Sequence, residues 1–382
     1  MLAVGPATSP SPREATPLSR RHGSPIMSTS GLSAADRARF EGRTRVTAQH
    51  HGRHLTMAVA MRVYNSERFV GDHLRSLITQ SVVPDEIVIG DDGSTDGTRA
   101  VIETVRSEAA ARPESAGIVW TLLPSEHHGI AGNIERTMAA CTADIVVVCD
   151  HDDISYPDRF ERIRDAFESR PALLFVHGDA DLIDETGASM GARLAATQAV
   201  SEWERGRYRA GEALDVLIRR NIVTGATAAF RRELLQSATP FPRSWVYDEW
   251  LGIVAAGLGG TDYLDDPTIG YRQHSSNKTG VRRRGVRERM ALLLAPGAAR
   301  NERLRTRAEV LVSRFESLGD RVPPARLALA QQKRDHERAR NAFPVNRLRR
   351  AIPVLRAAST GAYGRFARGR KDVLLDLVQP IR

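Results

Sequence analysis

The chain has 382 residues, of which 41% are apolar and 26% charged, so its length allows two or three domains with buried cores. No apolar run reaches the roughly 18 residues that a membrane-spanning helix needs, which argues against an integral membrane protein. Two cysteines, Cys141 and Cys149, are too few for a disulfide framework or a thiolate zinc site, so both are expected to pack as small core side chains.

The net charge of +9 is distributed unevenly along the chain. Counted by segment, residues 1–55 carry +5, residues 56–280 carry −12 and residues 281–382 carry +16. An acidic centre with a basic end is not a single nucleic-acid-binding face, so no nucleic-acid partner is expected. The pattern favours a carboxylate-rich catalytic body followed by a basic region that contacts an anionic membrane or associates with itself.

The first half of the chain predicts an α/β fold after a disordered segment at residues 1–55, which is rich in Pro, Ser, Gly and Arg and has no secretory signal. Hydrophobic spacing then alternates between the two periods of strands and helices. The expected strands are 57–63, 86–90, 118–123 and 144–149, and the expected helices are 66–80, 95–111 and 132–141. This alternation predicts a doubly wound, mainly parallel sheet.

Beyond residue 170 the sequence predicts two more strands, 172–177 and 224–230, and a helix over 247–256 with an acidic start. Residues 281–382 have helical apolar spacing, for example at 290–294 and 304–312, and form a basic helical C-terminal region. Prolines are expected to break this region into pieces, at Pro323, Pro324, Pro344 and Pro353.

Acidic residues follow the strands at the edge of the sheet where ligands bind in doubly wound folds. Asp150, Asp152 and Asp153 come directly after an apolar strand, and three carboxylates this close repel one another unless a cation lies among them. Oxygen ligands of this kind suit Mg²⁺ or Mn²⁺. The alternative is an acidic turn in which Asp153 or Ser155 caps the next helix.

A second acidic turn, Asp91 to Gly97, follows the second strand. It is either a structural turn whose side chains bond to nearby backbone, or a site where a carboxylate accepts hydrogen bonds from a base or ribose. No Gly-x-Gly-x-x-Gly or Gly-x-x-x-x-Gly-Lys-Ser/Thr motif follows any strand, which excludes dinucleotide-binding and P-loop enzymes.

An ordered series of motifs resembles the family-two glycosyltransferases of the GT-A fold, over roughly residues 57–280, and predicts a catalytic domain at 56–280. The motifs of the first half are Val63-Tyr64-Asn65-Ser66-Glu67, Pro84 to Ile89, Asp91 to Thr98, and Asp150-His151-Asp152-Asp153-Ile154 with Pro157-Asp158-Arg159. Those of the second half are Asn221 to Arg231, similar to the acceptor-side segment of bacterial rhamnosyltransferase-like members, Tyr247-Asp248-Glu249-Trp250 and Tyr271-Arg272-Gln273-His274.

The resemblance implies transfer of a sugar from a nucleotide diphosphate to an acceptor hydroxyl, such as a glycan or lipid-linked glycan, with inversion. It assigns the nucleotide sugar to Tyr64, Asn65, Glu67, Asp91, Asp92, Asp150 and Asp153. It assigns Mg²⁺ or Mn²⁺ to Asp152, with Asp150 and His274 as further ligands, and the catalytic base to Asp248 or Glu249.

Other interpretations stay open from the sequence alone. The alternative for His274 is an ordinary packed histidine, and the alternative for Asp248 is a helix cap. Ser155-Tyr156 stand where related members often have tryptophan, so the donated sugar is undefined. The alternative functions are a nucleotidyltransferase and a non-catalytic nucleotide- or glycan-binding relative. The expected location is cytoplasmic, with peripheral membrane contact or self-association through residues 281–382, where the segment 286–296 would present an apolar face.

Overall fold

The computed structural model describes residues 54–125, 127–275 and 296–380. The predicted disordered segment lies outside the described residues apart from its last two, and so does nearly all of the helix expected over 286–296. Both expectations therefore remain untested.

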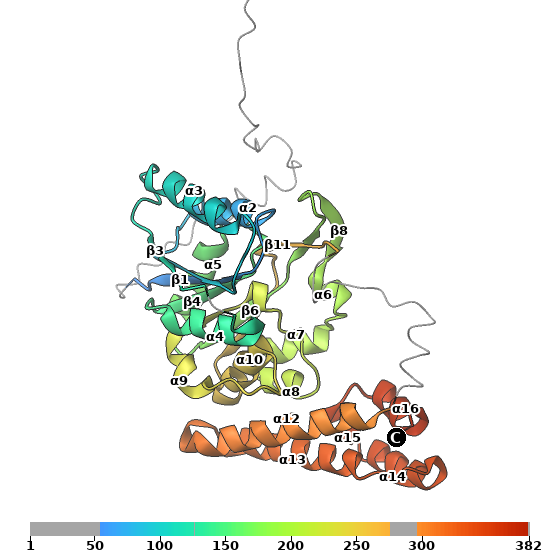
Figure 1. Cartoon of the computed structure of the whole chain (residues 1–382). Coiled ribbons are helices and arrows are strands. Elements are labelled where there is room, and N and C mark those ends of the chain that lie inside the picture. The colour runs from blue at the N-terminus through green and yellow to red at the C-terminus, as the bar shows by residue number, and fades with distance from the viewer. Residues whose placement is uncertain (1–53, 126, 276–295, 381–382) are drawn as a thin grey trace, which may run out of the picture. The chain divides into compact units, whose positions relative to one another are not determined.

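A seven-stranded sheet forms the centre of the α/β part, with the strand order β10-β6-β9-β4-β1-β2-β3 (Figure 1). All pairs in it are parallel except those of β9, which runs antiparallel to β4 and β6. The strands are β1 Met57–Val63, β2 Glu86–Asp91, β3 Val119–Leu122, β4 Ile145–Cys149, β6 Phe175–Gly178, β9 Ala229–Arg231 and β10 Thr261–Leu264. The predicted doubly wound, mainly parallel sheet is confirmed.

Helices cover both faces of this sheet, because the central strands are apolar on both sides. Alternate residues of β1 divide between two cores: Met57, Val59 and Met61 pack with α2, α3 and α5, whereas Ala58 and Ala60 pack with α4 and α10. Cys141 and Cys149 are buried in these cores, as expected. The five helices are α2 Val70–Ile78, α3 Thr98–Ala110, α4 Gly129–Ala140, α5 Arg159–Ser169 and α10 Tyr247–Leu258.

A smaller four-stranded sheet, which the sequence did not predict, has the order β5-β11-β7-β8. Its strands are β5 Ile154–Ser155, β7 Asp181–Ile183, β8 Ser189–Arg193 and β11 Ile269–Arg272. Strand β11 pairs with β5, which directly follows the acidic residues 150–153. This pairing brings the residues after β11 next to the acidic motif although more than a hundred residues separate them in the chain.

Several predicted boundaries and one predicted strand are wrong in detail. The helix expected from 66 begins at Val70, and the helix expected from 132 begins at Gly129. The strand expected over 224–230 is instead a 3₁₀ turn, η2 Gly225–Thr227, followed by β9. Short helices and 3₁₀ turns fill the rest of this part: α6 Leu194–Thr197, α7 Glu202–Arg209, α8 Ala213–Leu217, η3 Arg232–Leu234 and α9 Leu235–Ala238.

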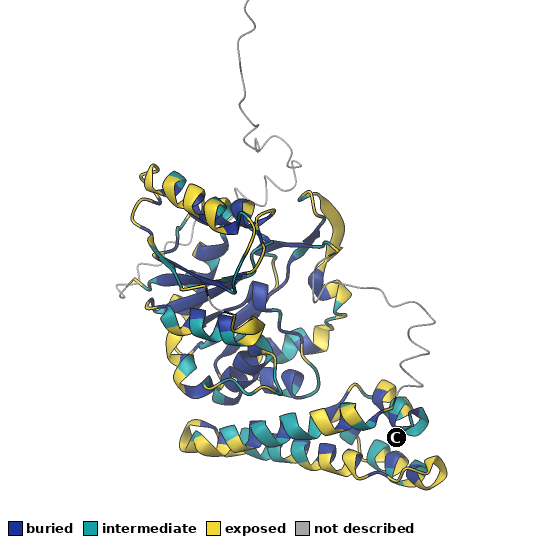
Figure 2. Ribbon diagram, viewed as in Figure 1, coloured by how far each residue is buried: buried dark blue, intermediate teal, exposed yellow. Residues whose placement is uncertain are grey.

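The C-terminal region is helical, as predicted. Its elements are α12 Ala298–Ser317, η4 Gly319–Arg321, α13 Pro324–Asn341, α14 Arg347–Ser359, α15 Ala362–Phe366 and α16 Arg370–Val378. Pro324 begins α13, where a proline costs no hydrogen bond, but Pro353 lies inside α14 and does not end it. The prediction that Pro353 breaks the helix is therefore wrong. Figure 2 shows that the buried residues concentrate in the sheet and its covering helices.

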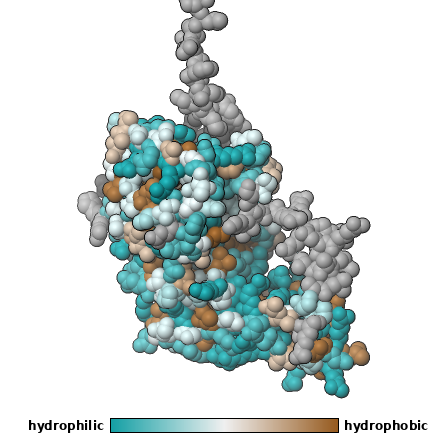
Figure 3. All heavy atoms as spheres, viewed as in Figure 1, coloured by the Kyte–Doolittle hydropathy of each residue, from teal (hydrophilic) through white to brown (hydrophobic). Residues whose placement is uncertain are grey.

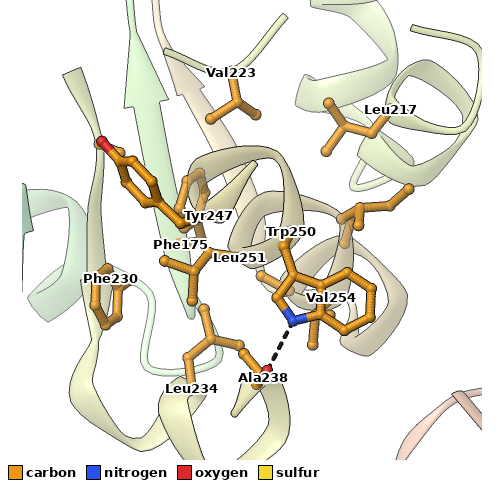
Figure 4. Close-up of a cluster of buried hydrophobic side chains, with 14 of the residues drawn as sticks. Phe175, Leu217, Val223, Phe230, Leu234, Ala238, Tyr247, Trp250, Leu251 and Val254 are labelled. Carbon is orange, nitrogen blue, oxygen red and sulfur yellow. Dashed lines mark hydrogen bonds between the residues drawn. The ribbon is translucent and has the colours of Figure 1, made fainter. Parts of the chain in front are cut away.

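Helix α10 is anchored at the centre of the larger core. Its Trp250 is fully buried and donates a hydrogen bond from Nε1 to the carbonyl oxygen of Ala238, at 2.8 Å (Figure 4). Phe315 of α12 belongs to the same core and is also fully buried. Helix α10, whose first turn carries Asp248 and Glu249, thus packs in a core to which the sheet and α12 both contribute.

Candidate active site

A cavity of about 550 Å³ lies at the carboxyl ends of β1, β2 and β4, the edge at which the sequence predicts a ligand. Six of the predicted site residues line it: Tyr64, Asn65, Asp92, Asp150, Asp152 and His274. They come from four separate segments of the chain. The structure therefore gathers the two acidic motifs and the late histidine around one space.

Asp152 and His274 face each other at this cavity. The Nε2 atom of His274 lies 2.8 Å from Oδ2 of Asp152, and both side chains are largely buried. The ring of Phe69 packs against the His274 imidazole with centroids 4.8 Å apart. Arg272 of β11 donates from Nε to the carbonyl oxygen of Asp152, at 2.6 Å, which ties the strand before His274 to the acidic motif.

Asp150 has a cationic partner that the sequence analysis missed. Arg62, the penultimate residue of β1, donates from Nη2 to Oδ1 of Asp150 at 3.2 Å, and both side chains are mostly buried. A single arginine in an otherwise apolar strand was the available signal, because a buried guanidinium needs a carboxylate or carbonyl partner.

The second acidic turn organises the opposite wall of the cavity. Oδ1 of Asp92 accepts hydrogen bonds from the backbone N–H groups of His128 and Gly129, at 2.7 and 3.0 Å, at the start of α4. Asn65 has a positive φ of 46°, and its Oδ1 accepts from the backbone N–H of Thr95 at 2.9 Å. These bonds tie the turn after β2 to the start of α4 and to the loop after β1.

Three residues predicted to bind the nucleotide sugar do not line the cavity: Glu67, Asp91 and Asp153. Glu67 accepts from the backbone N–H of Gly97 at 2.9 Å. Asp91 is fully buried; although burial acts to raise its pKa, hydrogen bonds from Ser94, Arg99 and Ser125 hold it below the usual value. Both carboxylates thus bond to the turn into α3 or its first residues, and their role in binding a nucleotide sugar stays a prediction.

Asp153 is a buried structural carboxyl. Its Oδ1 accepts from the backbone N–H of Arg272 at 2.9 Å, whereas Oδ2 is buried without a hydrogen-bond partner among the described residues. Burial, together with the charges of Asp152 and Asp150, raises its pKa well above the usual value. The hydrogen bond of this carboxyl to Arg272 joins the acidic motif to β11.

Asp248 and Glu249 are adjacent in α10 but face different surroundings. Oδ2 of Asp248 accepts from the backbone N–H of Gly225 at 2.8 Å, so the residue lies against the segment after α8 that enters β9. Glu249 forms an ion pair with Arg307 of α12 and lines a second cavity, of about 150 Å³. The structure thus separates two candidates that the sequence left together.

The environment of Asp248 gives it the acid–base properties of a catalytic base. Burial raises the pKa of its carboxyl from 3.8 to about 7, and the nearby charges of Glu249 and Asp150 act in the same direction. Asp150, which lines the main cavity, is therefore close enough to Asp248 to raise its pKa. A carboxylate with a pKa near neutrality is well suited to accept a proton during a reaction.

The donor set at the cavity fits a divalent cation that is held mainly by a bound substrate. Asp152 and His274 supply a carboxylate and an imidazole, which suit Mn²⁺ or Mg²⁺ together with phosphate oxygens. In the described parts of the chain no group of three His, Cys, Asp or Glu side chains is arranged to hold an ion without such help. Among the same residues, no helix is long and apolar enough to cross a bilayer.

The chain is similar to known glycosyltransferases. Residues 58–238 match the family model described as Glycosyl transferase family 2. An uncharacterized glycosyltransferase from a Nostoc species is 26% identical over 233 residues, which are 58% of this chain and 66% of that relative. The dTDP-rhamnosyl transferase RfbG of Shigella flexneri is 23% identical over 235 residues, 58% of this chain and 74% of that protein.

Two solved structures are also similar to this chain. The crystal structure of S. aureus TarS residues 1–349 in complex with UDP-GlcNAc is 14% identical, covers 80% of this chain and 81% of its own, and has a TM-score of 0.49. A mannosyltransferase of Pyrobaculum calidifontis in complex with GDP-Man and Mn²⁺ is 19% identical, covers 89% of each chain and has a TM-score of 0.43.

Proposed function

We propose that the protein transfers a sugar from a nucleoside diphosphate to an acceptor hydroxyl, on the premise that its residues 58–238 match the model of glycosyl transferase family 2. The observation that carries the proposal is the cavity of about 550 Å³ in which Asp92, Asp150, Asp152 and His274 meet. Its volume falls in the range of small-molecule and cofactor sites, and it lies at the ligand-binding edge of the sheet.

The donor binds across the two acidic loops. The wall formed by Tyr64, Asn65 and Asp92 takes the nucleoside, since an exposed aromatic ring and side-chain oxygens suit a base and its ribose. Asp150 is oriented by Arg62 and lies where it can accept a ribose hydroxyl. Because RfbG, a similar protein, is named a dTDP-rhamnosyl transferase, dTDP-sugars belong in the first donor panel beside UDP- and GDP-sugars.

Asp152 and His274 would hold a divalent cation together with the diphosphate. The cation would supply charge neutralisation for the departing nucleoside diphosphate. The residues of the chain keep these two donors in place: Arg272 anchors the backbone of Asp152, and Phe69 packs on the ring of His274. This arrangement fixes the diphosphate end of the donor relative to Asp150.

Asp248 serves as the general base and takes the proton of the attacking acceptor hydroxyl. Its pKa of about 7 allows a substantial ionised fraction at neutral pH. A direct displacement of this kind inverts the anomeric configuration, because the hydroxyl attacks from the side opposite the leaving diphosphate. Glu249 is bound to Arg307 in a different cavity and does not compete for this role.

The test is to incubate the full chain with UDP-, GDP- and dTDP-sugars, Mn²⁺ and a panel of glycan and lipid-linked glycan acceptors. Release of nucleoside diphosphate and of pyrophosphate is then measured. Release of nucleoside diphosphate that depends on Mn²⁺ and is lost in Asp152→Asn supports a glycosyltransferase. Release of pyrophosphate would instead identify a nucleotidyltransferase. Thermal stabilisation by a nucleotide sugar with neither product would identify a non-catalytic binder, because a bound ligand stabilises the fold by mass action.

A further inference from the structure

Helix α14 carries a row of large apolar side chains that are mostly exposed. Leu348, Ile352 and Leu355 have 85%, 74% and 56% of their surfaces exposed. Their spacing of four and three residues places them on one face of the helix. Three such side chains in one row differ from the scattered exposed hydrophobic residues that are normal on protein surfaces.

The orientation of this face is fixed by the packing of the opposite side of the helix. Val354 is fully buried, and Arg350, with 1% of its surface exposed, donates from Nη2 to the carbonyl oxygens of Leu377 and Gln379 at 3.1 and 2.7 Å. Helix α14 therefore cannot rotate to bury the row without breaking these contacts. In Figure 3, apolar atoms stand out among hydrophilic ones at the end of the molecule that α14 occupies in Figure 1.

Exposed arginines flank the row on both sides. At 100° per residue, Arg349 and Arg356 lie on one side of the row and Arg347 on the other, and all three are exposed. Residues 341–371 contain eight Arg and Lys and no Asp or Glu. The next two acidic residues, Asp372 and Asp376, are buried and bonded to Arg368 and Arg340. The face is thus apolar at its centre and positively charged at its edges.

We propose that this face of α14 docks on the surface of an anionic lipid bilayer. The row Leu348, Ile352 and Leu355 would enter the boundary between headgroups and acyl chains, with the arginines beside the lipid phosphates. A helix with an apolar stripe between cationic residues has the properties of an interfacial membrane-binding helix. The proposal stands independently of the sugar-transfer activity.

Charge complementarity favours lipid over a second copy of the chain. Two copies that paired through this face would bring their Arg347, Arg349 and Arg356 side chains together, and like charges at a contact disfavour it. An anionic membrane compensates these charges. A nucleic acid would also compensate them, but the centre of the face offers aliphatic side chains and no aromatic ring for base stacking.

The experiment is flotation of the full chain with vesicles of phosphatidylcholine alone and of phosphatidylcholine mixed with phosphatidylglycerol. We expect binding to the mixed vesicles only, weakening as salt is raised. Leu348→Gln/Ile352→Gln/Leu355→Gln should lower the partition coefficient about 100-fold, because burial of the apolar row is lost. Arg349→Gln/Arg356→Gln should lower it roughly 10- to 30-fold and reduce its salt dependence.

Matched controls exclude general effects of the substitutions. Met190→Gln removes a half-exposed apolar side chain on β8, and Arg112→Gln removes an exposed arginine just after α3; both should bind like the parent chain. Equal binding of the triple variant and the parent, or no preference for anionic vesicles, overturns the proposal. It is also overturned if the parent chain is a dimer in sedimentation and the triple variant a monomer that still binds vesicles, because the row would then serve self-association.

Discussion

Arg307 of α12 forms an ion pair with Glu249, the residue that follows the candidate base Asp248 in α10. The same guanidinium stacks on the ring of Trp245, 3.9 Å from its centroid, and the indole N–H of Trp245 donates to the carbonyl oxygen of Arg307 at 3.2 Å. The C-terminal helices therefore hold the first turn of α10 directly. Because Glu249 makes this contact, the ion pair supports the proposal of Asp248 as the base.

Substitution of the two neighbouring carboxylates should separate their roles. Asp248→Asn keeps an oxygen that can accept from the N–H of Gly225 but cannot take a proton, so kcat should fall by about 10² to 10⁴. Donor affinity, measured by calorimetry, should change little. Glu249→Gln is the matched control, and its main effect should be a lower melting temperature. A larger loss of kcat in Glu249→Gln than in Asp248→Asn would reverse the assignment.

The raised pKa of Asp248 predicts opposite pH effects on rate and on stability. As pH falls below about 7 the base becomes protonated, so kcat should drop about tenfold per pH unit. The pKa of Asp248 in the folded chain lies above its usual value of 3.8, so between about pH 4 and pH 7 the folded state holds a proton that the unfolded state has lost. The contribution of this carboxyl to the free energy of unfolding therefore falls as pH rises from about 4 to 7.

Both effects can be measured with the parent chain and one variant. The pH–rate profile of the parent chain gives the first, and urea unfolding of the parent and of Asp248→Asn at pH 5 and pH 8 gives the second. Asp248→Asn cannot ionise, so its stability relative to the parent should be higher at pH 8 than at pH 5. A difference that does not change with pH would mean that the carboxyl titrates near its ordinary value.

The pair formed by Asp152 and His274 should control cation-dependent donor binding. Asp152→Asn and His274→Gln should each weaken Mn²⁺-dependent binding of nucleoside diphosphate at least about tenfold, measured by electron paramagnetic resonance of free Mn²⁺. Asp320→Asn, at an exposed aspartate in η4, is the control and should leave binding unchanged. Unaltered Mn²⁺ binding in both site variants would remove these residues from the cation site.

The sequence predicted the parallel part of the fold well, because each element there carries its own pattern. Strand β1 is an apolar run with bounds that match the prediction, and α10 begins at the predicted residue. The smaller sheet could not be predicted, since its strands are only two to five residues long and β11 pairs with β5 and β7 across large sequence distances. The cavity residues that depend on this sheet were therefore found through family resemblance rather than through local pattern.

Adjacent acidic residues show where sequence reasoning reaches its limit. Asp150, Asp152 and Asp153 are equivalent in the sequence, yet the first two line the cavity and the third is buried against β11. Which carboxylate turns inward depends on the pairing of β5 with β11, a contact over more than a hundred residues. Asp248 and Glu249 are likewise alike in the sequence, because the ion pair of Glu249 with Arg307 joins residues that are far apart in the chain.

Two helical glycines should respond in opposite ways to the same substitution. A Cβ atom added to Gly257 of α10 would lie 2.2 Å from the ring of Phe315, whereas one added to Gly206 of α7 meets nothing within 4 Å. Gly206→Ala should stabilise the fold by about 0.5–1 kcal/mol, because alanine favours the helix and loses less backbone entropy.

Gly257→Ala brings the same gain in helix propensity but forces the fully buried ring of Phe315 to move, and overpacking of this kind costs about 1–3 kcal/mol. We therefore expect net destabilisation in urea unfolding. Phe315→Leu should partly relieve the clash, so the double variant Gly257→Ala/Phe315→Leu should be more stable than the sum of the two single effects. Strict additivity would show that Phe315 of α12 does not pack on α10 at Gly257.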